Sequence, residues 1–356
     1  MARVPRENDA LPWPGPRLGP IWVEWEIIPA ATHIHGGFAL FYPIRWIDHL
    51  LRARIMKDIL GPKKPGRSLH AEISVDGQDW QSVITLAKNT IITLCTTALK
   101  CGDRQLRVTS PWREVCRFDD RQVSHREYER RLSGGIRHQR QLTLCPRDNF
   151  FLFAETFLGP RVTTWDYKLE IGLSRETAVH PLPETQELEL AVGDYAGAIL
   201  PLAVPEWKSL TPQPGLVFGG DHIVARYATT GRAFFFPLCF LFWKDKRAAG
   251  NPPLAESSAN GQALPVTWRQ LTVSECLRKV SADEAVGFRF QLEKRQWLLY
   301  RSLTPPANRA VLGHNLVSEF LLARFTPKGQ VIPLVEVELD EESDSTSGTE
   351  TGTTTS

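Results

Sequence analysis

Apolar and polar residues alternate along most of this chain. In the segment SLHAEISV, residues 68–75, Leu69, Ala71, Ile73 and Val75 face one way, and the residues between them are polar. A period of two is that of a β-strand, and a strand that buries one face and wets the other is typical of antiparallel sheets. The same period recurs in QELELAV (186–192), in VGFRFQLE (286–293) and, after a turn predicted at 327–329, in VIPLVEVEL (331–339).

The predicted strands follow one another without helices between them. This order favours one large antiparallel sandwich over a parallel α/β sheet, and no repeat of fixed period indicates a propeller. One segment, RWIDHLLRARIMKDIL (45–60), differs because it places Ile47, Leu51 and Ile55 four residues apart, as an amphipathic helix does. We therefore predict an all-β protein, a large antiparallel β-sandwich of supersandwich type with one amphipathic helix near the N-terminus.

The two ends of the chain have a different composition from its middle. Residues 1–20 hold five prolines and predict an extended arm, whereas residues 340–356 are acidic and rich in Ser and Thr, a composition typical of disorder. Between them we predict a single sandwich domain over residues 21–339, including the helix at 45–60.

The overall composition narrows the classes of protein. Apolar residues make up 42% of the 356 residues and the net charge is +2, which points to neither nucleic acid nor a membrane. The six cysteines form no C-x-x-C pair, so a reducing compartment fits best. The most apolar run, AFFFPLCFLFW (233–243), is too short to cross a membrane, and we interpret it as a buried strand that bends or ends near Pro237. Residues 1–20 contain no apolar core of a signal peptide, so we expect a cytoplasmic protein.

Motifs for cofactors and metals are weak. The chain has no G-x-G-x-x-G, no G-x-S-x-G and no H-E-x-x-H, so no cofactor is predicted. His33 and His35 share one face of a possible strand and could hold a metal as cupin barrels do, but the sequence locates no third ligand. We predict no metal site and keep a cupin-like enzyme as a third hypothesis.

An arginine-rich segment is the strongest candidate for a ligand site. Residues 121–140 contain six arginines against Glu127 and Glu129, a net charge of +4, and Ser133-Gly134-Gly135 within it predicts a hairpin turn. Guanidinium groups suit bidentate capture of carboxylate or sulfate. The alternative is a solvated hairpin whose arginines pair with neighbouring acids and protect a sheet edge. The predicted ligand-binding residues are Arg126, Arg130, Arg137, Arg140 and His314.

A second polar stretch, RSLTPPANRAVLGHNL (301–316), lies between two apolar runs. His314 and Asn315 follow Gly313, where backbone could approach a partner closely. They could orient a sugar hydroxyl or neutralise a carboxylate beside a proton-abstracting base such as Tyr300. Equally, they could satisfy backbone groups at a bulge of a crowded sheet, which we favour because no convergent set of residues is apparent.

Three segments carry a family resemblance. TWRQLTVSE (267–275), VGFRFQLEKRQWLLYRSL (286–303) and VLGHNLVSEFLLARF (311–325) resemble the β-sandwich portion of heparinase II/III-like proteins, and a closer likeness is to stand-alone bacterial chains with such a sandwich. The resemblance implies a large multi-stranded sandwich and β-elimination on acidic glycans. The full enzymes add an N-terminal helical toroid that contributes to catalysis. This chain leaves no room for a toroid before residue 110, so no catalytic residue is carried over.

These observations lead to two functional predictions. The first is a non-catalytic β-sandwich protein that binds an acidic glycan or a protein partner, without nucleic acid or membrane. The alternative is a heparinase II/III-like lyase that acts on uronate-containing glycans, with Tyr300, His314 and Asn315 as its candidate catalytic residues.

Overall fold

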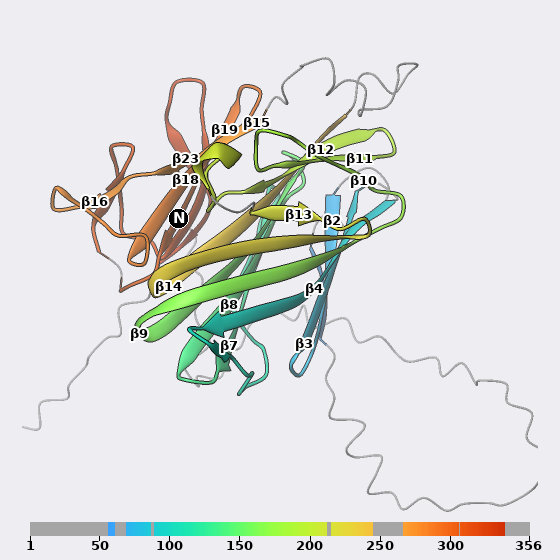
Figure 1. The fold of residues 1–356 in the computed structure, drawn as a ribbon. Coiled ribbons are helices and arrows are strands. Elements are labelled where there is room, and N and C mark those ends of the chain that lie inside the picture. The colour runs from blue at the N-terminus through green and yellow to red at the C-terminus, as the bar shows by residue number, and fades with distance from the viewer. Residues whose placement is uncertain are drawn as a thin grey trace, which may run out of the picture.

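The computed structural model of the protein describes residues 56–60, 69–86, 89–211, 215–244, 266–305 and 307–338. Within these ranges the chain forms three β-sheets and one short 3₁₀ turn, η2 (Lys208–Leu210). Every strand pairing is antiparallel. The predicted all-β antiparallel class is confirmed (Figure 1).

The largest sheet has 14 strands. They are β1 (Met56–Leu60), β2 (Leu69–Asp76), β3 (Asp79–Leu86), β4 (Asn89–Cys101), β5 (Arg104–Gln105), β6 (Arg113–Asp119), β7 (Ser124–Leu132), β8 (Ile136–Cys145), β9 (Phe150–Leu173), β10 (Ala178–Pro181), β11 (Leu188–Val192), β12 (Tyr195–Pro201), β13 (Leu216–Phe218) and β14 (His222–Lys244).

Two smaller sheets follow in the chain. The five-stranded sheet has the order β15 (Val266–Leu271), β18 (Ala285–Leu292), β19 (Arg295–Ser302), β22 (Phe320–Phe325) and β23 (Val331–Val337). The four-stranded sheet has the order β17 (Arg278–Lys279), β16 (Val273–Glu275), β20 (Arg309–Val311) and β21 (His314–Leu316).

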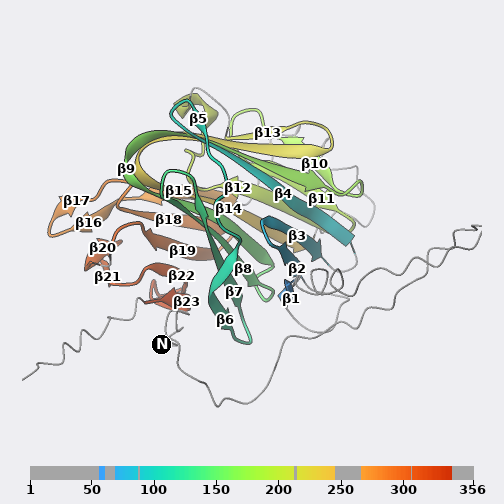
Figure 2. The same ribbon diagram turned by 90° about the horizontal axis from the view of Figure 1, so that it is seen from below.

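Strands β9 and β14 form the spine of the large sheet. They have 24 and 23 residues and pair along nearly their whole lengths, with a bulge between Gly231 and Ala233. The first half of β9 pairs with β8 and the second half with β4, so the sheet divides along this strand. Figure 2 shows β9 and β14 curving over as an arch between the two parts.

The apolar residues gather into three cores. The first joins β2, β3 and β4 to β7, β8, β9, β11, β12 and β14, because the arched sheet packs on itself. The second lies between the opposite face of β8, β9, β12 and β14 and the five-stranded sheet. The third lies between β19, β22 and the four-stranded sheet. Strands β7 and β8 are therefore covered on both faces.

The local predictions have mixed outcomes. Gly77, Gly134, Gly135 and Gly329 adopt the positive φ that the predicted turns require. The last five residues of the predicted helix, 56–60, are strand β1 and not helix, while residues 45–55 lie outside the described part. The arm 1–20, the tail 340–356, His33 and His35 also lie outside it.

The strand at 233–243 does not end near Pro237. Strand β14 continues through Pro237, which pairs with Ala154 of β9. The carbonyl of Pro237 still accepts a hydrogen bond from the Leu202 amide at 3.0 Å, so only the missing amide donor is lost from the ladder. The irregularity comes instead between Gly231 and Ala233.

Candidate functional site

The turn of the β7–β8 hairpin brings two arginines opposite each other. Arg131 and Arg137 are direct partners across the hairpin. The turn between them uses Gly134 and Gly135 at φ values of 81° and 74°, a left-handed conformation that side chains disfavour. The two guanidinium groups thus start from neighbouring positions on one face.

A third arginine comes from the segment before β6. Ser133 N donates to Arg107 O at 2.7 Å, and Val108 forms an isolated bridge with Leu132. Leu132 is buried in the first core and Val108 packs against that core. Because side chains alternate along an extended segment, Arg107 lies on the opposite face from Val108, the face that also carries Arg131.

A fourth arginine, Arg113 of β6, is the direct strand partner of Glu129 and so shares this face. Arg137 donates to Glu129 Oε2 through Nε and Nη2 at 3.0 and 2.7 Å. Arg107, Arg113 and Arg131 are exposed, and no ion pair within the described ranges engages them. We name Arg107, Arg113, Arg131 and Arg137 the arginine patch.

Among the described residues, Glu129 is the acid that pairs with the arginine patch, because Glu127, two residues away on the same face, is bound by Arg301. An exposed group of like charges repels itself and attracts a multivalent anion. Of the predicted ligand residues it includes Arg137 alone. Arg107 and Arg113 are not among the predicted residues, because their proximity depends on how residues 107–109 and strand β6 pair with the hairpin, which no local sequence pattern reveals.

Arg126, another predicted ligand residue, is held inside the protein. It is only 2% exposed. Its Nη1 and Nη2 donate to the two carboxylate oxygens of Asp119 at 3.0 and 2.8 Å, and Nη1 also donates to the carbonyl of His125 at 2.8 Å. A ligand would have to break this bidentate pair to reach the guanidinium group.

Arg140 is also buried, on the face of β8 that looks into the first core. Its Nε and Nη2 donate to Glu155 Oε1 at 2.9 and 2.5 Å. Its guanidinium carbon lies 4.3 Å from the ring centre of Trp80 and 5.0 Å from that of Trp112. These contacts place the guanidinium group of Arg140 over two aromatic faces, an arrangement that stabilises the packing of β8 in the core.

The same carboxylate organises His138 and Tyr167. Arg130 Nε donates to His138 Nδ1 at 3.1 Å, which leaves the proton on Nε2 to be donated to Glu155 Oε1 at 2.7 Å. Tyr167 donates to Glu155 Oε2 at 2.7 Å. We name Arg140, His138, Tyr167 and Glu155 the Glu155 cluster.

The environment fixes the protonation states of the Glu155 cluster. Burial lowers the pKa of His138 to about 4, although Glu155 opposes this, so the imidazole is neutral at pH 7. Burial disfavours the ionised form of Glu155, but Arg140 and His138 outweigh it and hold its pKa well below the usual range. Burial and Glu155 raise the pKa of Tyr167.

An acid, a base and a phenol within hydrogen-bonding distance resemble catalytic machinery, but access is lacking. His138, Glu155 and Tyr167 have no exposed surface, and Arg140 is 3% exposed. Their polar atoms form hydrogen bonds with one another, and the Thr97 hydroxyl also donates to Glu155 at 3.0 Å. A closed set of this kind stabilises one arrangement of the core strands and offers no position for a substrate.

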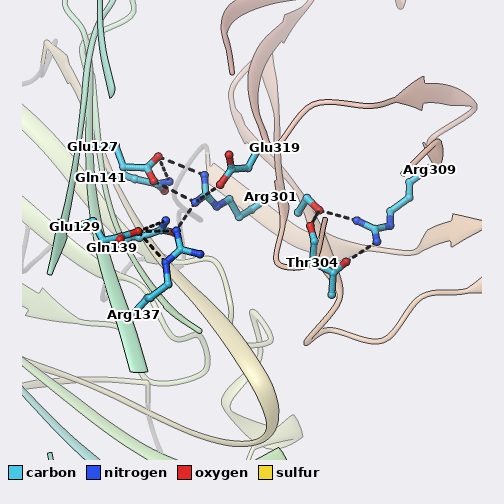
Figure 3. A network of polar contacts seen from close by, with 10 residues as sticks. Glu127, Glu129, Arg137, Gln139, Gln141, Arg301, Thr304, Arg309 and Glu319 are labelled. Carbon is cyan, nitrogen blue, oxygen red and sulfur yellow. Dashed lines mark hydrogen bonds and ion pairs between the residues drawn. The ribbon is translucent and has the colours of Figure 1, made fainter. Parts of the chain in front are cut away.

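A second buried network joins the large sheet to the five-stranded sheet. Arg301 of β19 donates to the carboxylate of Glu127 at 3.3 and 3.2 Å and to Gln139 Oε1 at 2.6 Å. It also pairs with Glu319 at 3.2 Å. Figure 3 shows Arg301 reaching between Glu127 and Glu319, with Glu129 and Arg137 beside them.

His125 of β7 faces the same interface. Its Nδ1 lies 2.7 Å from Thr143 Oγ1, and its ring stacks on Phe320 with ring centres 4.9 Å apart. Burial, and then the charges of Arg301 and Arg126, lower the pKa of His125 to about 3. The imidazole is therefore neutral at pH 7 as well.

The polar stretch at 301–316 serves mainly to connect the two smaller sheets. Arg309 donates to Glu275 at 3.0 Å and to the hydroxyls of Ser302 and Thr304, both at 2.7 Å. Tyr300 is buried in the third core, whereas His314 is half-buried and Asn315 exposed on the edge strand β21. No hydrogen bond joins these last three residues to one another in the described ranges, and the arginine patch does not include His314.

A groove of about 770 Å³ crosses β4, β9 and β14. Its charged lining alternates in sign: Lys100 pairs in register with Asp166, and Lys168 forms an ion pair of 2.6 Å with Glu170 beside the groove. Arg226 has no acidic partner of this kind among the described residues of the groove. The net charge of the groove lining is therefore small. The groove therefore attracts anions less than the arginine patch does.

No protein-family model matches the chain, and no curated protein matches its sequence. A heparan sulfate lyase HepC structure from Pedobacter heparinus aligns with a TM-score of 0.44 and 8% identity over 70% of this chain and 41% of that one. A heparinase III structure aligns with a TM-score of 0.40 and 7% identity over 70% and 41%. The chain thus has a weak fold resemblance to heparinase structures and spans less than half of their length. Similarity at this level says nothing of what the chain binds.

The described ranges contain neither a candidate metal site nor a candidate membrane-spanning helix. Within them no group of three or more His, Cys, Asp or Glu side chains is placed to hold a metal. Nor does any helix there have the length and apolar character to cross a membrane.

Proposed function

We propose that the protein is a non-catalytic β-sandwich module that binds an anionic glycan through the arginine patch. The observation that carries this proposal is the gathering of the exposed Arg107, Arg113 and Arg131 and the half-buried Arg137 on one face, beside Glu129. Guanidinium groups bind carboxylate and sulfate in bidentate fashion, and a polymer of such groups can engage several arginines at once.

The patch is supported by rigid structure. Away from its exposed turn, the hairpin that carries the patch is covered by the Glu155 cluster on one face and by the Arg301 network on the other. Arginines that start from a fixed backbone lose less conformational freedom on binding than arginines on a mobile loop. Both buried networks thus serve the site by fixing strands β7 and β8.

The test is retention on a heparin column at low salt. Arg107→Gln with Arg131→Gln removes two exposed charges of the patch, and we expect the protein to elute at clearly lower salt than the unmodified chain. The matched control is Arg161→Gln with Arg226→Gln, which removes the same charge from exposed positions on β9 and β14 and should leave elution unchanged. Equal shifts for both variants would show that only net charge matters, and would refute the patch.

The lyase alternative requires a reachable base. Tyr300 is buried, and the Glu155 cluster is closed. We expect no absorbance of a 4,5-unsaturated uronate when the protein is incubated with a panel of acidic glycans. A rising ultraviolet trace would contradict the non-catalytic part of the proposal.

A further inference from the structure

The described chain ends in the sheet that packs against the β7–β8 hairpin. Val337 closes β23, pairs with Phe320 of β22, and accepts a hydrogen bond from Glu319 N at 2.8 Å. Phe320 in turn pairs with Arg301 of β19. Two strand spacings, about 10 Å, therefore separate Val337 from the backbone of Arg301. The side chain of Arg301 bonds Glu127 and Gln139 of the β7–β8 hairpin.

The chain leaves β23 in the direction of the arginine patch. At the start of β19, Trp297 Nε1 donates to Asp148 Oδ2 at 3.1 Å, beyond the end of β8. Near the end of β19, Arg301 bonds Gln139, which is close to the beginning of β8 and to the hairpin turn. Moving along β19 toward Arg301 therefore means moving toward the turn, and Val337 lies at that same end of its sheet.

The remaining gap is short. Gln139 is two residues from Arg137 along β8, about 7 Å. Figure 3 shows both beside Arg301 and Glu319. The crossing from β19 to β8 adds about 10 Å, the usual distance between packed sheets. The thirteen residues 338–350 reach at most about 45 Å when extended, which exceeds the sum of these steps.

The segment that follows has the opposite charge to the patch. Residues 340–350 read DEESDSTSGTE, with five acidic residues and no Lys or Arg, and none of residues 351–356 is charged. The patch offers four guanidinium groups against Glu129. An acidic segment tethered this close has a local concentration in the millimolar range, so even weak ion pairs would be occupied.

We propose that the acidic segment 340–350 docks on the arginine patch and competes with its external ligand. This inference rests on the arginine patch of the proposed function, but it does not require that the external ligand be a glycan. The docked segment limits the binding of external anions to the patch. To displace the segment, a ligand must carry more negative charge than the segment does, or more closely spaced negative charge. The affinity for an external anion is then lower than the patch alone would give.

The first experiment measures heparin oligosaccharide binding by the full chain at low salt. Asp340→Asn, Glu341→Gln, Glu342→Gln and Asp344→Asn together remove four of the five negative charges of the segment, and we call this variant the segment-neutralised chain. We expect binding to tighten by roughly 10-fold. The matched control neutralises four exposed acids elsewhere, namely Asp166→Asn, Glu176→Gln, Glu184→Gln and Asp194→Asn. Tightening by the same factor in both variants, or in neither, would overturn the proposal.

The second experiment needs no glycan. A fluorescein-labelled synthetic peptide of residues 338–351 is titrated with the segment-neutralised chain up to millimolar concentration, and anisotropy is recorded. We expect saturable binding that Arg107→Gln with Arg131→Gln weakens at least 5-fold and that Arg161→Gln with Arg226→Gln leaves unchanged. Absence of binding, or equal binding by both arginine variants, sinks the inference. Peptide binding without heparin binding in any variant would instead sink the proposed function alone.

Discussion

Acidification should unfold this protein through two histidines. His125 and His138 have no exposed surface and are neutral in the folded state, with pKa values of about 3 and about 4 that burial lowers from 6.5. In the unfolded chain both imidazoles take up protons near pH 6.5, whereas the folded chain takes them up only well below that. The unfolded state therefore binds more protons between pH 6.5 and 4, and stability falls as the pH falls.

The size of the effect follows from linkage. A difference of one unit between folded and unfolded pKa corresponds to about 1.4 kcal/mol. At pH 4.5, two units below the unfolded value, each histidine has cost the folded state about 2.5 kcal/mol relative to pH 7. The two together predict a loss of about 5 kcal/mol, a large part of the 5–15 kcal/mol typical of a folded domain.

The assay is urea unfolding followed by tryptophan fluorescence at pH 7, 6, 5.5, 5 and 4.5. We expect the free energy of unfolding to fall by about 2.7 kcal/mol per pH unit below pH 6, the slope for two protons. Replacement of both histidines (His125→Gln and His138→Gln) should flatten this slope, whatever it does to stability at pH 7. A loss below 1 kcal/mol between pH 7 and 4.5, or an equal slope in the double variant, would refute the reasoning.

Two more predictions concern packing and the hairpin. Arg301→Ala leaves the buried carboxylate of Glu127 unpaired and should lower the free energy of unfolding by about 3–5 kcal/mol. Adding Glu127→Gln to that variant should recover part of the loss in the same urea assay. Gly135→Ala introduces a side chain at a φ of 74° and should cost about 1 kcal/mol. An unchanged unfolding midpoint would contradict the left-handed turn that positions Arg131 and Arg137.

The sequence predicts the fold class well because alternation and turn chemistry are local. The strand Leu69–Asp76 alternates between buried and less buried positions as the text SLHAEISV predicts. The turn at Gly329 joins β22 and β23 where expected. Each of these features is decided by neighbours within a few residues, so no knowledge of the tertiary structure is needed.

The site is harder to predict because it depends on which layer a strand occupies. Residues of β7 and β8 read as a solvated hairpin, yet Arg126 and Arg140 are buried because a sheet or a core covers each face. Glu187 and Glu189, expected on a wet face of their strand, are likewise buried. Arg140 is bound by Glu155 of the next strand and Glu127 by Arg301 of another sheet, and no periodicity in the sequence carries that information.

The joint role of β9 and β14 also governs how the chain can assemble. Each spans both parts of the large sheet, and β14 begins about 50 residues after β9 ends. During synthesis β9 emerges before β14, the strand that pairs with it. The side chains of Phe150, Phe151 and Phe153, which are buried in the folded protein, are exposed until β14 has been made. Contacts between segments distant in the sequence form slowly, so the nascent chain exposes an apolar, unpaired strand edge before β14 pairs with β9. We therefore expect aggregation at this stage of folding to limit the yield of folded protein.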